Sequence, residues 1–245
     1  EMCIRDRYTN AFIEGFNETK DMITCIKHFP GDGTEERDQH LVLGVNEMTP
    51  EEWDQSIRKV YTNHINNGVE MIMSGHIALP HYSKKLNPNL HDEDILPASL
   101  SKELITDLLK QDLNFNGLVV TDASHMLGMT ASMKREDYVP LAIAAGCDMF
   151  LFFNDIEEDF NFMLQGYRKG VITEERLNDA VTRILGLKAK IHLHDKQAQQ
   201  KLEKEEAELD VIGCDEHIEM QKEAADLGIT SVSYTHLTLP TNREV

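Results

Sequence analysis

The chain has 245 residues, of which 41% are hydrophobic and 27% are charged, a globular composition long enough for one sizeable core. Its formal net charge of −19 argues against nucleic acid or an anionic membrane surface as a partner. No stretch is apolar and long enough to span a membrane. The four cysteines show neither a disulfide framework nor a Cys-x-x-Cys metal spacing, so we expect reduced thiols.

The two ends of the sequence differ in origin from the rest. Residues 1–7 match the translation of a transposon end used in sequencing libraries, and residues 232–245 begin as the translation of its reverse complement with adapter. We interpret both segments as adapter-derived and exclude them from fold reasoning. Residues 8–231 are then expected to be an internal fragment of a longer polypeptide, and the compartment is left open.

Apolar runs and turn residues predict alternating helices and strands along the chain. Thr49-Pro50-Glu51-Glu52 has the residue order of a capping box with proline in the first turn, and Asn66-Asn67-Gly68 ends that helix. A long polar loop is expected from His76 to Pro97. The other expected elements are helix 9–19, strand 22–26, strand 69–73, a helix capped by Ser101, strand 118–120, helix 138–145, strand 149–153, helix 155–167 and helix 173–193.

The strands are short and fully apolar, which is typical of a parallel sheet in an α/β protein. Polar residues follow the carboxyl ends of the predicted strands, namely Lys27 and His28, His76, Asp122, and the Asn154-Asp155 pair. In a (β/α)₈ barrel this end of the strands carries the active site. A doubly wound sheet would also fit four βα units, so both architectures remain open from this pattern.

Two segments resemble a known enzyme family. The run Lys27-His28-Phe29-Pro30-Gly31-Asp32-Gly33, followed by Asp38-x-His40, resembles the signature of family 3 glycoside hydrolases, specifically their β-N-acetylglucosaminidase (β-hexosaminidase) branch. The segment 115–122 resembles the part of that family that carries the nucleophile. The resemblance implies that residues 8–196 are the C-terminal half of a (β/α)₈ barrel. Residues 197–231 are expected to be an acidic helical connecting segment toward a second domain.

The resemblance also implies roles for individual residues. By itself, an Asp after a buried strand is more often a helix cap, but the resemblance places Asp122 on the nucleophile position, where an ionised carboxylate under the anomeric carbon would trap an oxocarbenium-like species. His40 falls on the acid/base position, with Asp38 two residues away to orient its ring. Lys27 and His28 match ligands of the sugar hydroxyls.

Other motifs are weaker. For His76 the sequence leaves two roles open, a substrate ligand or structural support. Gly31 and Gly33 are better explained by a tight turn than by a phosphate loop, because no helix start follows. The segment 192–195, His-Leu-His-Asp, lies at a helix end, where cationic side chains suit the helix dipole, so we do not predict a metal site there.

The resemblance implies a retaining, exo-acting hydrolase that removes terminal β-linked N-acetylglucosamine from cell-wall fragments or chitin-derived sugars. Its partner would be a small carbohydrate, with no metal or organic cofactor, and the fragment itself is expected to be inactive. The alternatives are a family 3 β-glucosidase or phosphorylase, and a non-catalytic sugar-binding module. The oligomeric state stays open.

Overall fold

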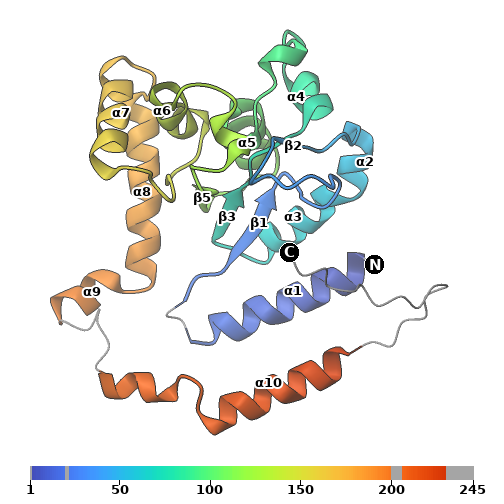
Figure 1. The fold of residues 1–245 in the computed structure, drawn as a ribbon, viewed down its shortest axis with the longest axis vertical. Coiled ribbons are helices and arrows are strands. Elements are labelled where there is room, and N and C mark those ends of the chain that lie inside the picture. Colours follow the sequence, from blue (N-terminus) through green and yellow to red (C-terminus); the bar gives the residue numbers. More distant parts are fainter. Residues whose placement is uncertain (1, 20–21, 200–205, 230–245) are drawn as a thin grey trace, which may run out of the picture. The chain divides into compact units, whose positions relative to one another are not determined.

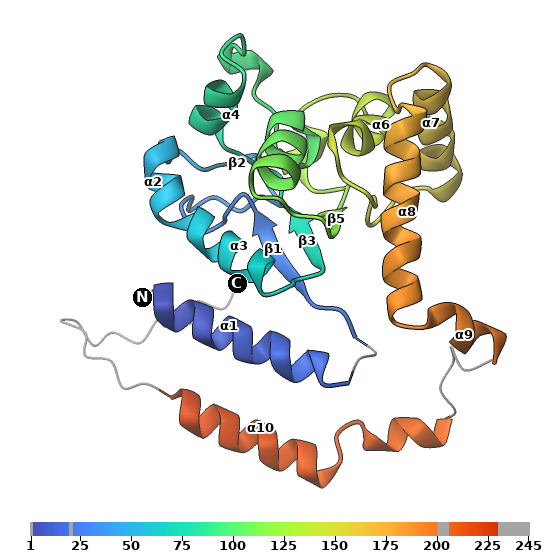
Figure 2. The same ribbon diagram turned by 180° about the vertical axis from the view of Figure 1, so that it is seen from behind.

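A computed structural model of the protein describes residues 2–19, 22–199 and 206–229 (Figures 1 and 2), so the segment 232–245 lies outside it. The chain divides into two compact units, residues 1–194 and 195–245. Within the second unit the structure contains a 3₁₀ segment, η4 (Glu206–Val211), and the helix α10 (Asp215–Gly228). None of the helices in the described ranges is long and apolar enough to cross a membrane.

A three-stranded parallel sheet organises the first unit. It consists of β1 (Cys25–Phe29), β3 (Met71–Ser74) and β5 (Leu118–Thr121), in the order β1-β3-β5. Ile72 lies opposite Ile26 on one side and opposite Val119 on the other, so the strands end at the same edge. A short parallel pair, β2 (Gly44–Val45) with β4 (Ile77–Ala78), lies outside this sheet. The predicted parallel α/β class is confirmed.

Helices flank both sides of the sheet: α2 and α3 lie on the β1 side, whereas α6, α7 and α8 gather on the β5 side (Figures 1 and 2). The helical elements of the first unit, with one that crosses its boundary, are α1 (Met2–Asn17), α2 (Pro50–Gln55), α3 (Ile57–Asn66), α4 (Pro80–Leu86), η1 (Asp92–Asp94), η2 (Ala98–Leu100), the π-helix η3 (Glu103–Asp112), α5 (Leu127–Thr130), α6 (Arg135–Ala145), α7 (Ile156–Arg168), α8 (Glu174–Lys190) and α9 (Leu193–Ala198). The capping box at the start of α2 is confirmed, because Thr49 Oγ1 accepts the Glu52 N–H and the Glu52 carboxylate accepts the Thr49 N–H.

Several predicted boundaries were wrong. The segment 149–153 is not a strand: Met149 forms a single bridge with Val120, and Phe152 has a φ of 53° that extended backbone does not allow. The predicted polar loop contains α4 and β4. β1 starts at Cys25 rather than at 22 and runs on to Phe29, so Lys27 and His28 lie within the strand. Helix α1 starts at Met2, inside the segment that we interpret as adapter-derived.

The core packs the sheet against α2, α3 and η3. Phe29, Trp53, Ile72 and Val119 are all fully buried within one apolar cluster. Trp53 has a polar partner as well, since its indole Nε1–H donates to the Pro30 carbonyl at 2.7 Å. Because that carbonyl belongs to the turn directly after β1, the core fixes the loop that leaves the strand at the site described below.

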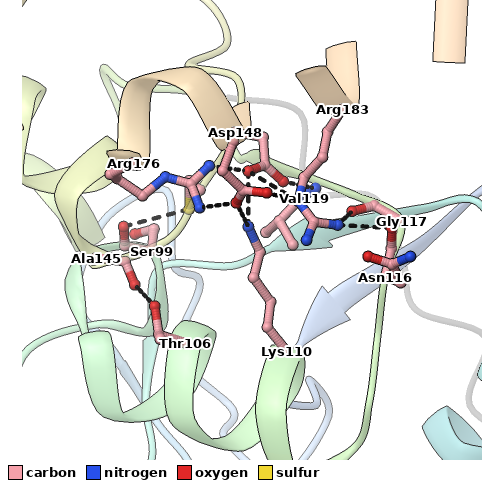
Figure 3. Close-up of polar contacts among 12 residues, drawn as sticks. Ser99, Thr106, Lys110, Asn116, Gly117, Val119, Ala145, Asp148, Arg176 and Arg183 are labelled. Carbon is pink, nitrogen blue, oxygen red and sulfur yellow. Dashed lines mark hydrogen bonds and ion pairs between the residues drawn. The ribbon is translucent and has the colours of Figure 1, made fainter. Parts of the chain in front are cut away.

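A buried carboxylate lies at the amino end of β5 (Figure 3). Asp148 has no exposed side-chain surface and accepts hydrogen bonds from Lys110 Nζ (2.7 Å), from Arg176 and from the Val119 N–H (2.8 Å). Burial lowers the pKa of Lys110, an effect that the neighbouring Asp148 carboxylate opposes. A buried carboxylate is tolerated only when it is fully paired, so these contacts tie η3 and α8 to the strand.

Arg183, about two turns further along α8 than Arg176, completes this attachment. Its guanidinium donates to the carbonyls of Asn116 (2.7 Å) and Gly117 (3.0 Å), which form the turn that enters β5 (Figure 3). Its Nε also donates to Asp179 at 2.9 Å. We refer to Asp148, Lys110, Arg176, Arg183 and Asp179 together as the Asp148 cluster. It fixes the amino end of β5, whereas Asp122, a predicted site residue, follows the carboxyl end of this strand.

Candidate active site

Asp122 is the first residue after β5, and its surroundings fix its carboxylate. Its backbone N–H donates to the Ser74 carbonyl at 3.0 Å, which continues the pairing with β3. Its Oδ1 accepts the Ala123 N–H at 2.7 Å, and its Oδ2 lies 3.3 Å from His28 Nε2. The Asp122 side chain is only 14% exposed. One oxygen is therefore held by the backbone, while the other faces a titratable neighbour at the edge of the sheet.

His28 lies between two carboxylates. Its Nε2 faces Asp122, and its Nδ1 is 3.5 Å from Asp32 Oδ2. Burial lowers the pKa of His28, although the Asp122 carboxylate acts in the opposite direction. Lys27 beside it is exposed, and its side chain forms no hydrogen bond or ion pair with the residues that the structure describes. The peptide bonds Lys27–His28 and Phe29–Pro30 are both cis.

His76 follows β3 and is completely buried. Its Nε2 lies 2.9 Å from the Ala123 carbonyl, which can only accept, so Nε2 carries the proton and Nδ1 accepts from Ser99 Oγ at 2.8 Å. Burial lowers the pKa of His76, which favours the neutral ring that these two contacts call for. Both ring nitrogens are thus occupied in this conformation, and the geometry favours structural support of the segment after Asp122 over direct contact with a ligand.

Asp38 and His40 form a hydrogen-bonded pair on an exposed loop. Asp38 Oδ1 lies 2.7 Å from His40 Nδ1 and also accepts the His40 backbone N–H at 2.9 Å. These two hydrogen bonds lower the pKa of Asp38. The ionised carboxylate holds Nδ1 protonated and leaves Nε2 for proton transfer. With side chains 59% and 66% exposed, the pair is open to a ligand that approaches from solvent.

Backbone contacts attach this loop to the segment that follows Asp122. The Leu127 N–H donates to the His40 carbonyl at 3.1 Å, and the Gly128 N–H donates to the Gln39 carbonyl at 3.2 Å. A Cβ atom at position 128 would lie 2.9 Å from that Gln39 carbonyl and 2.9 Å from the Cβ of His76. Glycine is therefore required for this close approach. The structure brings the predicted acid/base loop and the predicted nucleophile segment together.

Sequence reasoning missed two polar residues of the site. Asp32 was part of the quoted motif but was given no role, although it contacts His28 and accepts a hydrogen bond from Gln39 at 3.2 Å. Gln39 separates Asp38 from His40, and its side chain is buried. A single glutamine in a polar loop carries no sequence signal of burial, so only the tertiary contacts reveal it.

A cavity of about 520 Å³ lies beside the site, outside β1. It is lined mostly by apolar side chains of α1, β1 and α3, with Lys27, His28 and Asp32 at its polar end. Asp122 is not part of its lining, so this cavity is not the place where a bond to Asp122 would form. In the described part of the chain, no group of three or more His, Cys, Asp and Glu residues is arranged to hold a metal ion.

Comparison with known sequences finds one enzyme family. The sequence profile described as the glycosyl hydrolase family 3 N-terminal domain matches residues 2–187. A Cellulomonas fimi protein named β-N-acetylglucosaminidase/β-glucosidase is 47% identical over 230 residues, which cover 93% of this chain and 40% of that protein. A β-hexosaminidase of Idiomarina loihiensis is 30% identical over 149 residues, or 61% of this chain and 41% of that protein. The chain thus spans about two fifths of the length of these relatives.

Solved structures show the same likeness. A β-glucoside phosphorylase superposes with a TM-score of 0.70 at 45% sequence identity, over 71% of this chain and 31% of that one. A family 3 β-N-acetylglucosaminidase from Paenibacillus sp. str. FPU-7 superposes with a TM-score of 0.65 at 28% identity, over 73% of this chain and 33% of that one.

Proposed function

Because this chain belongs to glycosyl hydrolase family 3 through the N-terminal domain of that family, we propose that its protein is a retaining exo-glycosidase. Its substrates would carry a terminal β-linked N-acetylglucosamine, as cell-wall and chitin-derived sugars do. The observation that supports this most is the joining of two functional loops. The loop of Asp38 and His40 is hydrogen-bonded to the segment that directly follows Asp122.

In the proposed first step, Asp122 attacks the anomeric carbon while the glycosidic bond breaks. The carboxylate oxygen forms the new bond, and the electron pair of the broken bond goes to the departing oxygen. His40, protonated and stabilised by Asp38, gives its Nε2 proton to that oxygen. The Ala123 N–H on Asp122 Oδ1 keeps the other carboxylate oxygen in place during the attack.

In the second step, water hydrolyses the glycosyl ester. Neutral His40 takes a proton from the water, whose oxygen attacks the anomeric carbon and releases Asp122 as a carboxylate. Lys27, exposed and without a protein partner in the described part, and His28 would bind the sugar hydroxyls. We assign His76 a supporting role, since it holds the Ala123 carbonyl next to the nucleophile.

We further propose that residues 8–196 form the C-terminal half of a (β/α)₈ barrel and that residues 197–231 lead toward a second domain. Two open edges support this. Beyond the outer edge of β1 lies the cavity of about 520 Å³, and next to Met149 an almost entirely apolar cavity of about 380 Å³ lies against α7 and α8. Such edges call for further strands.

Coexpression with the first half of a family 3 barrel should convert a broad thermal transition into a cooperative one, and a sharp melt of the isolated chain would refute the proposal.

The substrate proposal is tested by comparing two nitrophenyl glycosides on a complete polypeptide that contains this chain. The account expects faster turnover of the N-acetylglucosaminide than of the matching glucoside. A large preference for the glucoside would overturn it.

A phosphorylase is the second candidate, and the 45% identity to a β-glucoside phosphorylase structure favours it specifically. A neutral imidazole also repels an incoming phosphate less than a second carboxylate would. In that case phosphate would replace water in the second step. Turnover that requires inorganic phosphate and yields a sugar 1-phosphate would identify this reaction, whereas turnover unchanged by phosphate would exclude it.

A further inference from the structure

Gln39 lies between Asp38 and His40 in the sequence, but its side chain is buried whereas theirs are exposed. Its residue surface is 8% exposed, whereas the side chains of Asp38 and His40 are 59% and 66% exposed. A polar side chain loses its hydrogen bonds to water when it is buried, so it needs partners inside the protein. Gln39 finds them on three different segments.

These partners all follow strands of the sheet. Gln39 Nε2 donates to Asp32 Oδ2 (3.2 Å) after β1, and its Oε1 accepts the His76 N–H (3.1 Å) after β3. Its backbone carbonyl accepts the Gly128 N–H (3.2 Å) on the segment after β5. A single residue of the acid/base loop therefore contacts the segments that follow all three strands of the sheet.

One of these partners, Asp32, connects Gln39 to the proposed nucleophile through His28. Asp32 Oδ2, the acceptor of the Gln39 amide, is 3.5 Å from His28 Nδ1, and His28 Nε2 is 3.3 Å from Asp122 Oδ2. The side chain of Arg37 makes no such contact: it is 57% exposed and pairs with Glu35 in the same loop.

We propose that Gln39 is a positioning residue that holds the Asp38/His40 loop in register with Asp122. This rests on the proposed function, because it concerns the place of the proton donor relative to the nucleophile. A proton donor displaced by about 1 Å can slow the step it serves by about 10²-fold. When the side chain of Gln39 is lost, the loop keeps its two backbone hydrogen bonds to Leu127 and Gly128 but loses the side-chain hydrogen bonds to Asp32 and His76. The position of His40 relative to Asp122 is then held less firmly.

The test compares three variants of a complete polypeptide that contains this chain. Gln39→Met keeps the volume and removes both side-chain hydrogen bonds. Gln39→Glu keeps an acceptor for His76 but places a carboxylate against Asp32. Arg37→Ala is the matched control, since it removes a contact within the same loop that does not reach the strand ends.

The readout is the ratio of rates on a natural disaccharide and on an activated aryl glycoside. The disaccharide needs a proton on its leaving oxygen, whereas the activated leaving group does not. We expect Gln39→Met to slow the disaccharide about 10- to 100-fold and the aryl glycoside less than about 3-fold. Gln39→Glu should fall between Gln39→Met and the wild type, and Arg37→Ala should match the wild type. A merely structural residue would slow both substrates equally, and that result would overturn the proposal.

Amide hydrogen exchange tests the anchoring without any turnover. The amides of His76, Leu127 and Gly128 donate to Gln39 or His40 and should exchange faster in Gln39→Met than in Arg37→Ala. Unchanged exchange overturns the anchoring. If the wild type cleaves no glycoside, the proposed function fails, and the exchange data alone decide whether Gln39 fixes the loop.

Discussion

Two carboxylate–cation groups lie toward opposite ends of β5 and differ in almost every respect. At the amino end, Asp148 is fully buried and meets Lys110 and Arg176 together with a backbone N–H. Toward the carboxyl end, the Asp38 carboxylate contacts His40 alone among the residues that the structure describes, and both side chains are mostly exposed. The first group joins two helices to a strand, whereas the second is confined to one loop.

Because of this difference, we expect the first group to matter for folding stability and the second for the chemical reaction. A buried charge is costly unless every partner is present, so the Asp148 cluster works as a unit and should matter for folding. An exposed ion pair adds little to stability because water screens it. The Asp38/His40 pair is therefore better explained by the proton transfer that its exposure permits. The predictions below test this separation.

The largest effect is expected at Asp122. Replacing it with Asn keeps an acceptor for the Ala123 N–H but removes the nucleophile, so turnover should fall on the order of 10⁴-fold. The melting temperature should change little. Steady-state kinetics and a thermal melt of the same sample check both statements, and a variant that keeps a tenth of the activity would exclude Asp122 as nucleophile.

Asp148→Asn should produce the opposite pattern. It leaves Lys110 and Arg176 buried without their counter-charge, which costs about 3–5 kcal/mol of unfolding free energy. Denaturant unfolding measures this loss. The folded fraction should keep the wild-type ratio of rates on natural and activated substrates, and a changed ratio would show that the two ends of β5 are not independent.

His40→Ala should slow natural disaccharides about 10²- to 10³-fold while it barely affects activated aryl glycosides. Asp38→Asn should act in the same direction but more weakly, because the imidazolium keeps its place and loses its counter-charge. Neither change should lower the melting temperature measurably. A plot of rate against leaving-group pKa checks this, and a slope no steeper than that of the wild type would mean that His40 is not the proton donor.

The smallest effect concerns pH. Burial lowers the pKa of both His28 and His76 below the ordinary value of 6.5. As pH falls below that value, the unfolded chain takes up protons that the folded chain excludes, so stability is full above about pH 6.5 and declines below it. Unfolding curves from pH 8 to 5 should show a shallower decline for His76→Gln than for His125→Gln, a change at an exposed position. Equal declines would contradict the assignment.

Local signals in the sequence predicted much of the fold. The capping box of Thr49 and Glu52 involves neighbours along the chain, so its residue order was sufficient. The prediction of a strand at 149–153 was wrong, because a strand requires hydrogen-bonded partners along its length. The apolar composition of the segment does not reveal that only one of its residues, Met149, forms a bridge, to Val120. The extent of the sheet is a tertiary property.

The candidate site also contains residues that local sequence predicts and residues that only tertiary contacts reveal. Asp38, His40 and Asp122 belong to family motifs that could be recognised residue by residue. Gln39 and Asp32 depend on contacts between segments that follow different strands, and no spacing along the chain encodes those contacts. The supporting residues of this site are therefore harder to predict than the residues to which we assign its chemistry.

The central claim is that Asp122 forms a covalent glycosyl ester. It is tested most directly by incubating a complete polypeptide that contains this chain with a 2-fluoro glycoside that carries an activated leaving group, and then mapping the label by peptide mass spectrometry. The account predicts one sugar on the peptide that contains Asp122, in the wild type and in His40→Ala, and none in Asp122→Asn. A label on any other residue, or undiminished labelling of Asp122→Asn, would contradict it.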